Sequence, residues 1–122
     1  DGRSILVPIT GSRDHLGQQQ FLMHYPHGPH RSNYFTVWRD GDWKVIYHNF
    51  PKSPPLGGKV QSGGERYELF NLVKDPFEST NVAKENPLVL KKMMQGLAAQ
   101  LKHHGAVYPQ DQAGKAIKPI LP

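Results

Sequence analysis

The chain has 122 residues, no cysteine and a formal net charge of +5, from fifteen Lys and Arg against ten Asp and Glu. This length favours one small domain with a thin core, and the lack of cysteine excludes disulfides, thiolate metal sites and a Cys nucleophile. The basic residues are scattered rather than grouped, which argues against nucleic-acid binding. Neither a targeting signal nor an apolar run long enough to span a bilayer is present, which argues against a membrane protein.

The first half of the chain predicts three strands. Residues 1–17 form a leading segment that proline and glycine interrupt, and an apolar run of strand length follows at 18–25. Two runs rich in β-branched and aromatic residues, 34–39 and 43–48, flank Asp40-Gly41-Asp42. An Asp-Gly pair between such runs predicts a tight hairpin, because the favoured turns need positive φ at their centre.

The second half predicts one more strand and one helix. Residues 50–64 hold three prolines and four glycines, which predicts an exposed loop before an alternating strand at 66–72. In the helix we expect Asn86 as N-cap, Pro87 at the first position and Gly105 as C-cap. The apolar residues that recur at helical spacing are Leu90, Met93, Met94, Leu97 and Leu101.

These elements predict a single α+β domain over residues 1–122. We expect a three- to four-stranded antiparallel sheet with one long C-terminal helix packed on a face. This arrangement buries the apolar side chains of the alternating strands against the apolar stripe of the helix. The sheet and helix occupy 18–105. The leading segment 1–17 and a tail at 106–122 are expected to be extended, and the tail to lie against another surface or project freely.

Two motifs are more specific than the elements that contain them. They are Arg39-Asp40-Gly41-Asp42-Trp43-Lys44-Val45-Ile46 and the stretch Glu68-Leu69-Phe70-Asn71-Leu72, Asp75-Pro76-Phe77-Glu78 and Asn81. With Asp1-Gly2-Arg3-Ser4-Ile5-Leu6 and His24-Tyr25-Pro26-His27, in this order and spacing, they resemble the C-terminal subdomain of sulfatases of the bacterial arylsulfatase and N-acetylgalactosamine-6-sulfatase-like type. Val45, Phe70 and Asn71 stand where Leu, Tyr and Asp are usual in that family.

The resemblance implies the C-terminal portion of a sulfatase, a sulfuric ester hydrolase. The lobe would pack on a missing N-terminal catalytic domain, help to shape the pocket for a sulfated small molecule or carbohydrate, and be inactive alone. That domain would carry the formylglycine, made from Cys or Ser in a C/S-x-P-x-R signature, and a divalent cation, with calcium favoured; neither belongs to this chain. A periplasmic or secreted location is implied, and the exposed docking face could support self-association.

Four residues around the end of the first strand are candidate substrate-binding groups: His24, His27, His30 and Arg31. The H-x-x-H-x-x-H spacing lacks a fourth ligand, so a metal site is not expected. The resemblance places His24 and His27 at the mouth of the active-site cleft, where an imidazole can donate to a substrate oxygen or attract sulfate when protonated. The alternative is a strand-end histidine bonded to a backbone carbonyl.

Other polar and aromatic residues are expected to be structural. Trp38 and Trp43 fit core or interface anchors, with a carbohydrate-stacking platform as the alternative. Glu68, Asp75 and Glu78 do not fit the carboxylate pair of a glycosidase, because Asp75-Pro76 opens a turn and Glu78 fits a role in closing a loop. No catalytic residue is therefore assigned to this chain.

A second class of function is a free-standing module that binds sulfated glycans or other anions, for which the positive charge is the motivation. Within the first class, phosphonate-ester and phosphate hydrolases related to sulfatases remain open, because the residues that distinguish them lie in the catalytic domain.

Overall fold

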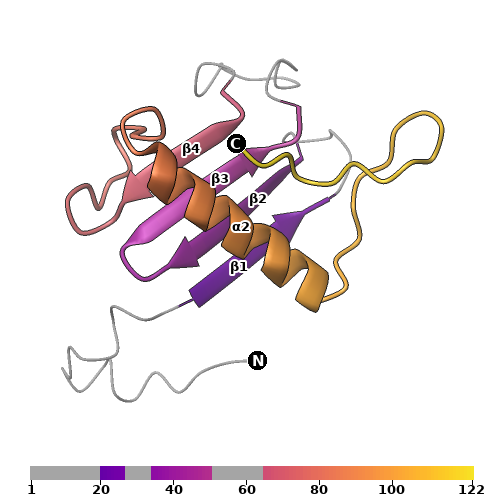
Figure 1. The fold of residues 1–122 in the computed structure, drawn as a ribbon, viewed down its shortest axis with the longest axis horizontal. Helices are drawn as coiled ribbons and strands as arrows, with labels where there is room; N and C mark the ends of the chain where they lie inside the picture. Colours follow the sequence, from indigo (N-terminus) through magenta and orange to yellow (C-terminus); the bar gives the residue numbers. More distant parts are fainter. Residues whose placement is uncertain (1–19, 27–33, 51–64) are drawn as a thin grey trace.

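The computed structural model describes residues 20–26, 34–50 and 65–122, which form a four-stranded antiparallel sheet with one long helix across a face (Figure 1). The sheet order follows the chain: β1 (Gln20–Tyr25), β2 (Phe35–Asp40), β3 (Trp43–His48) and β4 (Tyr67–Asn71), followed by α2 (Pro87–His103). The predicted α+β class is confirmed. The leading segment and most of the predicted 50–64 loop lie outside the described residues.

The β2–β3 hairpin forms where the Asp-Gly pair predicted it. Asp40 and Trp43 are opposite one another in the ladder, so Gly41 and Asp42 make a two-residue loop. Of these two, Gly41 alone has positive φ, at 58°, which is the pattern of a type II′ turn. Glycine adopts this conformation without a steric penalty, and the turn thereby fixes the register of both strands.

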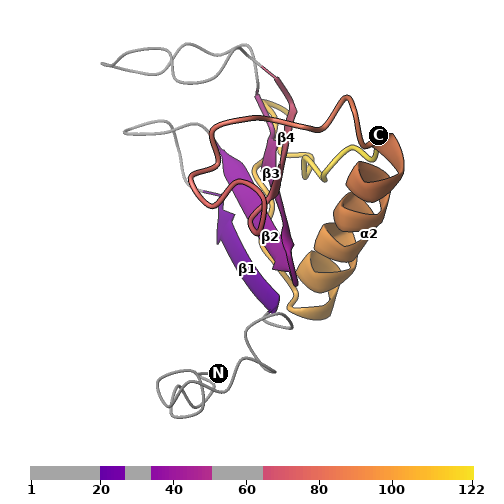
Figure 2. The same ribbon diagram turned by 90° about the vertical axis from the view of Figure 1, so that its left-hand side faces the viewer.

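The core lies between the sheet and α2, in two layers that Figure 2 shows edge-on. The register places Leu22, Trp38, Val45 and Leu69 in one row across the four strands, and all four belong to or pack against the buried cluster. The predicted apolar stripe of the helix is confirmed, since each of its five residues is buried. Trp38 is thus a core anchor, as expected, and Trp43 packs against the same cluster.

The two ends of α2 differ in how they are closed. Pro87 begins the helix as predicted, but Asn86 does not cap it with its side chain; the amide instead donates to the Val82 carbonyl at 3.0 Å. At the other end the Ala106 N–H donates to the Leu101 carbonyl and the Gly105 N–H to that of Lys102. With Gly105 at φ 60°, this is a Schellman motif, which ends the helix where the glycine predicted.

Helix and sheet approach closely at Gly96. A Cβ atom added there would lie 2.9 Å from Trp38 Nε1, closer than real side-chain contacts. Glycine inside a helix lowers helix stability relative to alanine, so its presence here is explained by packing against the indole. In the described ranges, no helix is both long and apolar enough to cross a membrane.

Candidate functional site

His24 lies near the end of β1, on the side of the sheet that faces α2. Its Nε2 is 2.7 Å from the Val107 carbonyl oxygen and its Nδ1 is 2.8 Å from Thr36 Oγ1. A carbonyl can only accept, so Nε2 carries the proton and the Thr36 hydroxyl donates to Nδ1 in the neutral ring. Tyr108 meets the imidazole edge to face, with 6.1 Å between ring centroids.

These contacts include the backbone-carbonyl bond that was the alternative to substrate binding, so both ring nitrogens of His24 have partners within the chain. A role toward substrate stays a prediction for this residue. The other three candidates, His27, His30 and Arg31, lie outside the described residues, so their placement relative to His24 stays a prediction.

A second histidine, which the sequence analysis did not single out, pairs with a carboxylate. His48 Nε2 and Glu68 Oε1 are 2.6 Å apart on the face opposite α2, with side chains 23% and 14% exposed. A carboxylate that holds an imidazole fixes its orientation and lets its other nitrogen exchange a proton. The two residues are diagonal neighbours across β3 and β4, and that register could not be inferred across the long 50–64 loop.

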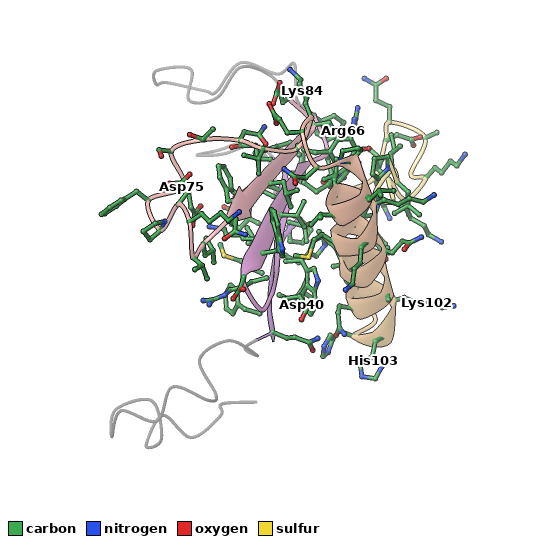
Figure 3. The ribbon with its side chains drawn as sticks, turned by 60° about the vertical axis from the view of Figure 1, so that its left-hand side comes forward. Asp40, Arg66, Asp75, Lys84, Lys102 and His103 are labelled. Carbon is green, nitrogen blue, oxygen red and sulfur yellow. The ribbon has the colours of Figure 1, made fainter. Side chains whose placement is uncertain are left out.

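The turn after β4 is folded by the acidic residues of the second motif. Asp75 accepts from the Ser79 hydroxyl at 2.8 Å and from the Thr80 N–H at 2.9 Å. Hydrogen bonds from the backbone N–H groups of Ser79 and Thr80, and to a smaller extent from the Ser79 hydroxyl, hold the pKa of its carboxyl below the usual value. Figure 3 shows Asp75 in this turn, on the side of the sheet away from α2. Glu78, at φ 55°, extends its carboxylate to Lys44 Nζ at 2.6 Å. A bulky residue at positive φ is strained, so the turn is held by its contacts.

Asn81 joins the same turn to the outer edge of β4. Its Oδ1 accepts from the backbone N–H groups of Leu69 and Ala83, at 2.9 and 3.0 Å, and its Nδ2 donates to the Tyr67 carbonyl at 3.1 Å. The Val82 N–H also donates to the Leu69 carbonyl. The edge of β4 is therefore covered by the chain's own backbone rather than left open.

The carboxylates considered for glycoside hydrolysis are thus engaged: Glu68 with His48, Asp75 within its turn and Glu78 with Lys44. Arg39 donates through Nε to the Gly41 carbonyl, which is a contact within the hairpin. Among the described residues, no group of three or more His, Cys, Asp or Glu side chains is placed to hold a metal ion. A scan against known protein families and a search of curated proteins each found no match to this chain.

Proposed function

We propose that this chain is the C-terminal lobe of a sulfatase. In this proposal it packs on a separate catalytic domain, helps to shape the pocket for a sulfated small molecule or carbohydrate, and does not break the ester bond itself. The catalytic domain supplies formylglycine as the nucleophile and a divalent cation, with calcium favoured, that stabilises the developing charge.

One observation carries the proposal. Four of the residues that give the sequence its resemblance to sulfatases span 37 positions, from Lys44 to Asn81, and meet in a single structural unit: Lys44 pairs with Glu78, Asp75 closes the turn and Asn81 bonds to β4. These contacts would be lost if any of the motif residues stood at another position in the sequence, so the spacing of the motif is tied to this fold. The motif thus supports a shared fold and assigns no chemistry to these residues.

The face opposite α2 supports a docking role. Phe21 and Met23 are 55% and 42% exposed on β1, and alternation places them on the same face as Tyr25, Phe35 and Ile46. Exposed apolar groups that gather on one face are typical of a surface that another domain covers. We infer that the catalytic domain lies against this face.

The first test is the gene sequence that precedes Asp1. We expect it to encode a large α/β domain with a Cys or Ser followed by x-Pro-x-Arg, and the purified chain without that domain to leave 4-nitrophenyl sulfate intact. An upstream region without the signature, or turnover of the aryl sulfate by this chain alone, would contradict the proposal. Parallel assays with aryl phosphates and phosphonate esters distinguish a sulfatase from its relatives.

The second test addresses the pocket. In the complete enzyme, His24→Ala and His27→Ala are expected to lower kcat/KM while the folded fraction is unchanged. Unchanged kinetics in both variants would mean that these residues take no part in substrate recognition.

Sedimentation of this chain distinguishes the two classes of function. A docking lobe is expected to self-associate. A free-standing glycan-binding module is expected to be a monomer, and its binding to sulfated glycans is expected to weaken strongly with salt.

A further inference from the structure

The side of α2 that faces away from the sheet carries charge of one sign. Figure 2 shows the helix as the outer layer on its side of the sheet. The helix holds Lys91, Lys92, Lys102 and His103, all of them exposed, and the sequence from 86 to 110 contains neither Asp nor Glu. In the rest of the chain acidic and basic residues are interspersed, so α2 differs from it in charge.

The four residues form two parallel pairs along the helix axis. Lys91 and Lys102 are 11 positions apart, and so are Lys92 and His103. At 3.6 residues per turn this spacing makes about three turns, so the members of each pair lie in line, about 16 Å apart. Figure 3 shows Lys102 and His103 at the last turn of α2, directed away from the sheet. Basic residues that look scattered in the sequence are thus grouped by the helix.

The surface between the two pairs is uncharged. A rotation of 100° per residue places Gln95 and Ala99 there, and both are exposed. The small side chain of Ala99 lets an elongated ligand approach the helix between the two pairs. We call this surface the outer face of α2, and it consists of Lys91, Lys92, Gln95, Ala99, Lys102 and His103.

The acids that flank this stretch in the sequence have local partners. Glu85 precedes the helix and acts electrostatically on Lys84, which also pairs with Glu65 at 2.6 Å. Asp111 follows the helix and accepts backbone N–H groups within its own turn. The segments on either side of α2 therefore leave the charge of the outer face in place.

The kinds of residue on this face discriminate among anionic partners. Single-stranded nucleic acids bind through aromatic platforms and arginine, and α2 contains no Phe, Tyr, Trp or Arg. A helix that lies on a lipid surface turns its apolar side to the lipid, whereas the apolar stripe of α2 is buried against the sheet. Lysine is a compact point charge without the bidentate geometry of arginine. Such a face fits a polymer that carries point charges along its length.

We propose that the outer face of α2 binds a sulfated polysaccharide, which lies along the helix axis between the two basic pairs. The proposal does not rest on the assignment to sulfatases. It is compatible with that assignment, because α2 lies on the face opposite the one that we infer to dock and would stay exposed in the complete enzyme. There the outer face would hold a polymeric substrate on the enzyme between successive hydrolysis steps.

The test uses the full 122-residue chain and three polymers of similar length: dextran sulfate, uncharged dextran and single-stranded DNA. Calorimetric titration at low salt is expected to show binding of dextran sulfate, none of dextran and weaker binding of DNA. Added salt is expected to weaken the binding, because exposed charges are screened. In nuclear magnetic resonance spectra the shifted amides are expected to lie in α2 rather than in β1 or the turn at 72–80.

Two double variants of equal net charge test the place of binding. Lys91→Gln with Lys102→Gln removes one pair and is expected to weaken binding about fivefold, since each exposed charge contributes little by itself. Lys74→Gln with Lys115→Gln is the matched control, because both lysines are exposed outside α2, and it is expected to keep the affinity within about twofold.

A second pair of variants separates charge from size. Ala99→Glu places a carboxylate between the basic pairs and is expected to weaken binding about tenfold or more, whereas Ala99→Gln is expected to change it little. Circular dichroism checks that both remain folded.

No binding of dextran sulfate, binding of DNA as tight as that of dextran sulfate, equal losses in the two double variants, or equal effects of Glu and Gln at position 99 would each overturn the proposal. None of these results would touch the assignment to sulfatases, which depends on the sequence before Asp1 and on the opposite face of the sheet.

Discussion

The two faces of the sheet carry similar numbers of apolar side chains but differ in how the chain covers them. The face toward α2 is closed by the helix and by the C-terminal segment, whose Ile120 backbone bonds to the Tyr47 and Tyr67 hydroxyls. The opposite face is covered near β4, where the turn at 72–80 is tied down through Lys44 and Glu78, and it exposes Phe21 and Met23 near β1. Among the described residues, the first face therefore holds the core, whereas the second leaves apolar side chains of β1 exposed, and it is this second face that we propose a partner covers.

The largest expected effect comes from the core on the helix side. Leu97 is fully buried there, and Leu97→Ala is expected to lower the free energy of unfolding by about 2–5 kcal/mol through lost burial and a residual cavity. Leu88, which is exposed on the same helix, provides the control, since Leu88→Ala is expected to change this free energy by less than about 0.5 kcal/mol. Urea unfolding followed by circular dichroism measures both, and equal losses would mean that this face is not the core.

Gly96→Ala tests the close approach between the helix and Trp38. Alanine raises helix propensity by about 1 kcal/mol, but its methyl group would overlap the indole, and overpacking costs about 1–3 kcal/mol. A net destabilisation of about 1 kcal/mol is expected in urea unfolding. Adding Trp38→Phe, which removes the crowded nitrogen, is expected to reduce the penalty of the alanine. A more stable Gly96→Ala variant would show that the indole moves aside freely.

The turn on the open face is expected to respond to acid. Because hydrogen bonds lower the pKa of Asp75 in the folded chain, the carboxylate contributes stability that is fully present above its unfolded pKa of about 4 and is lost as pH falls through the lower folded value. Urea unfolding between pH 6 and 3 is expected to show this loss. Asp75→Asn removes the titrating group, so an identical pH profile in that variant would assign the acid sensitivity to other carboxylates.

The smallest expected effect on stability comes from the exposed apolar residues. Phe21→Ser together with Met23→Ser is expected to change the free energy of unfolding by less than about 1 kcal/mol, because both residues are already about half exposed and lie on the edge strand. The same variant is expected to suppress self-association in sedimentation and binding of the catalytic domain. A large loss of stability, or association that persists, would show that this face belongs to the fold rather than to an interface.

Several elements were predictable because their causes are local. The Asp-Gly turn, the alternating strands and the apolar stripe between Pro87 and Gly105 each follow from the conformational preferences of neighbouring residues. Asn86 occupies the N-cap position as predicted, but its side chain makes no capping bond, because its amide is turned to donate to the Val82 carbonyl instead. Local preference favours a side-chain cap at this position, but the turn that precedes the helix places the Val82 carbonyl within reach of the Asn86 amide.

The candidate site was less predictable. Of its four residues the structure describes His24, whose partners Thr36 and Val107 lie 12 and 83 positions away. The His48–Glu68 pair depends on the register of β3 against β4, which no local pattern encodes across the intervening loop. Long-range pairing of this kind is set by packing and loop closure together.

The sequence alone determined the strands, the helix and the apolar stripe of the helix, because periodicity and turn chemistry act over a few residues. Only the tertiary structure decided which groups meet: that Lys44, Asp75, Glu78 and Asn81 form one unit, and that the Tyr47 and Tyr67 hydroxyls hold the backbone of Ile120. These contacts depend on the register between strands and on the path of the chain after α2, and both are fixed when the apolar row and the helix stripe are buried against each other.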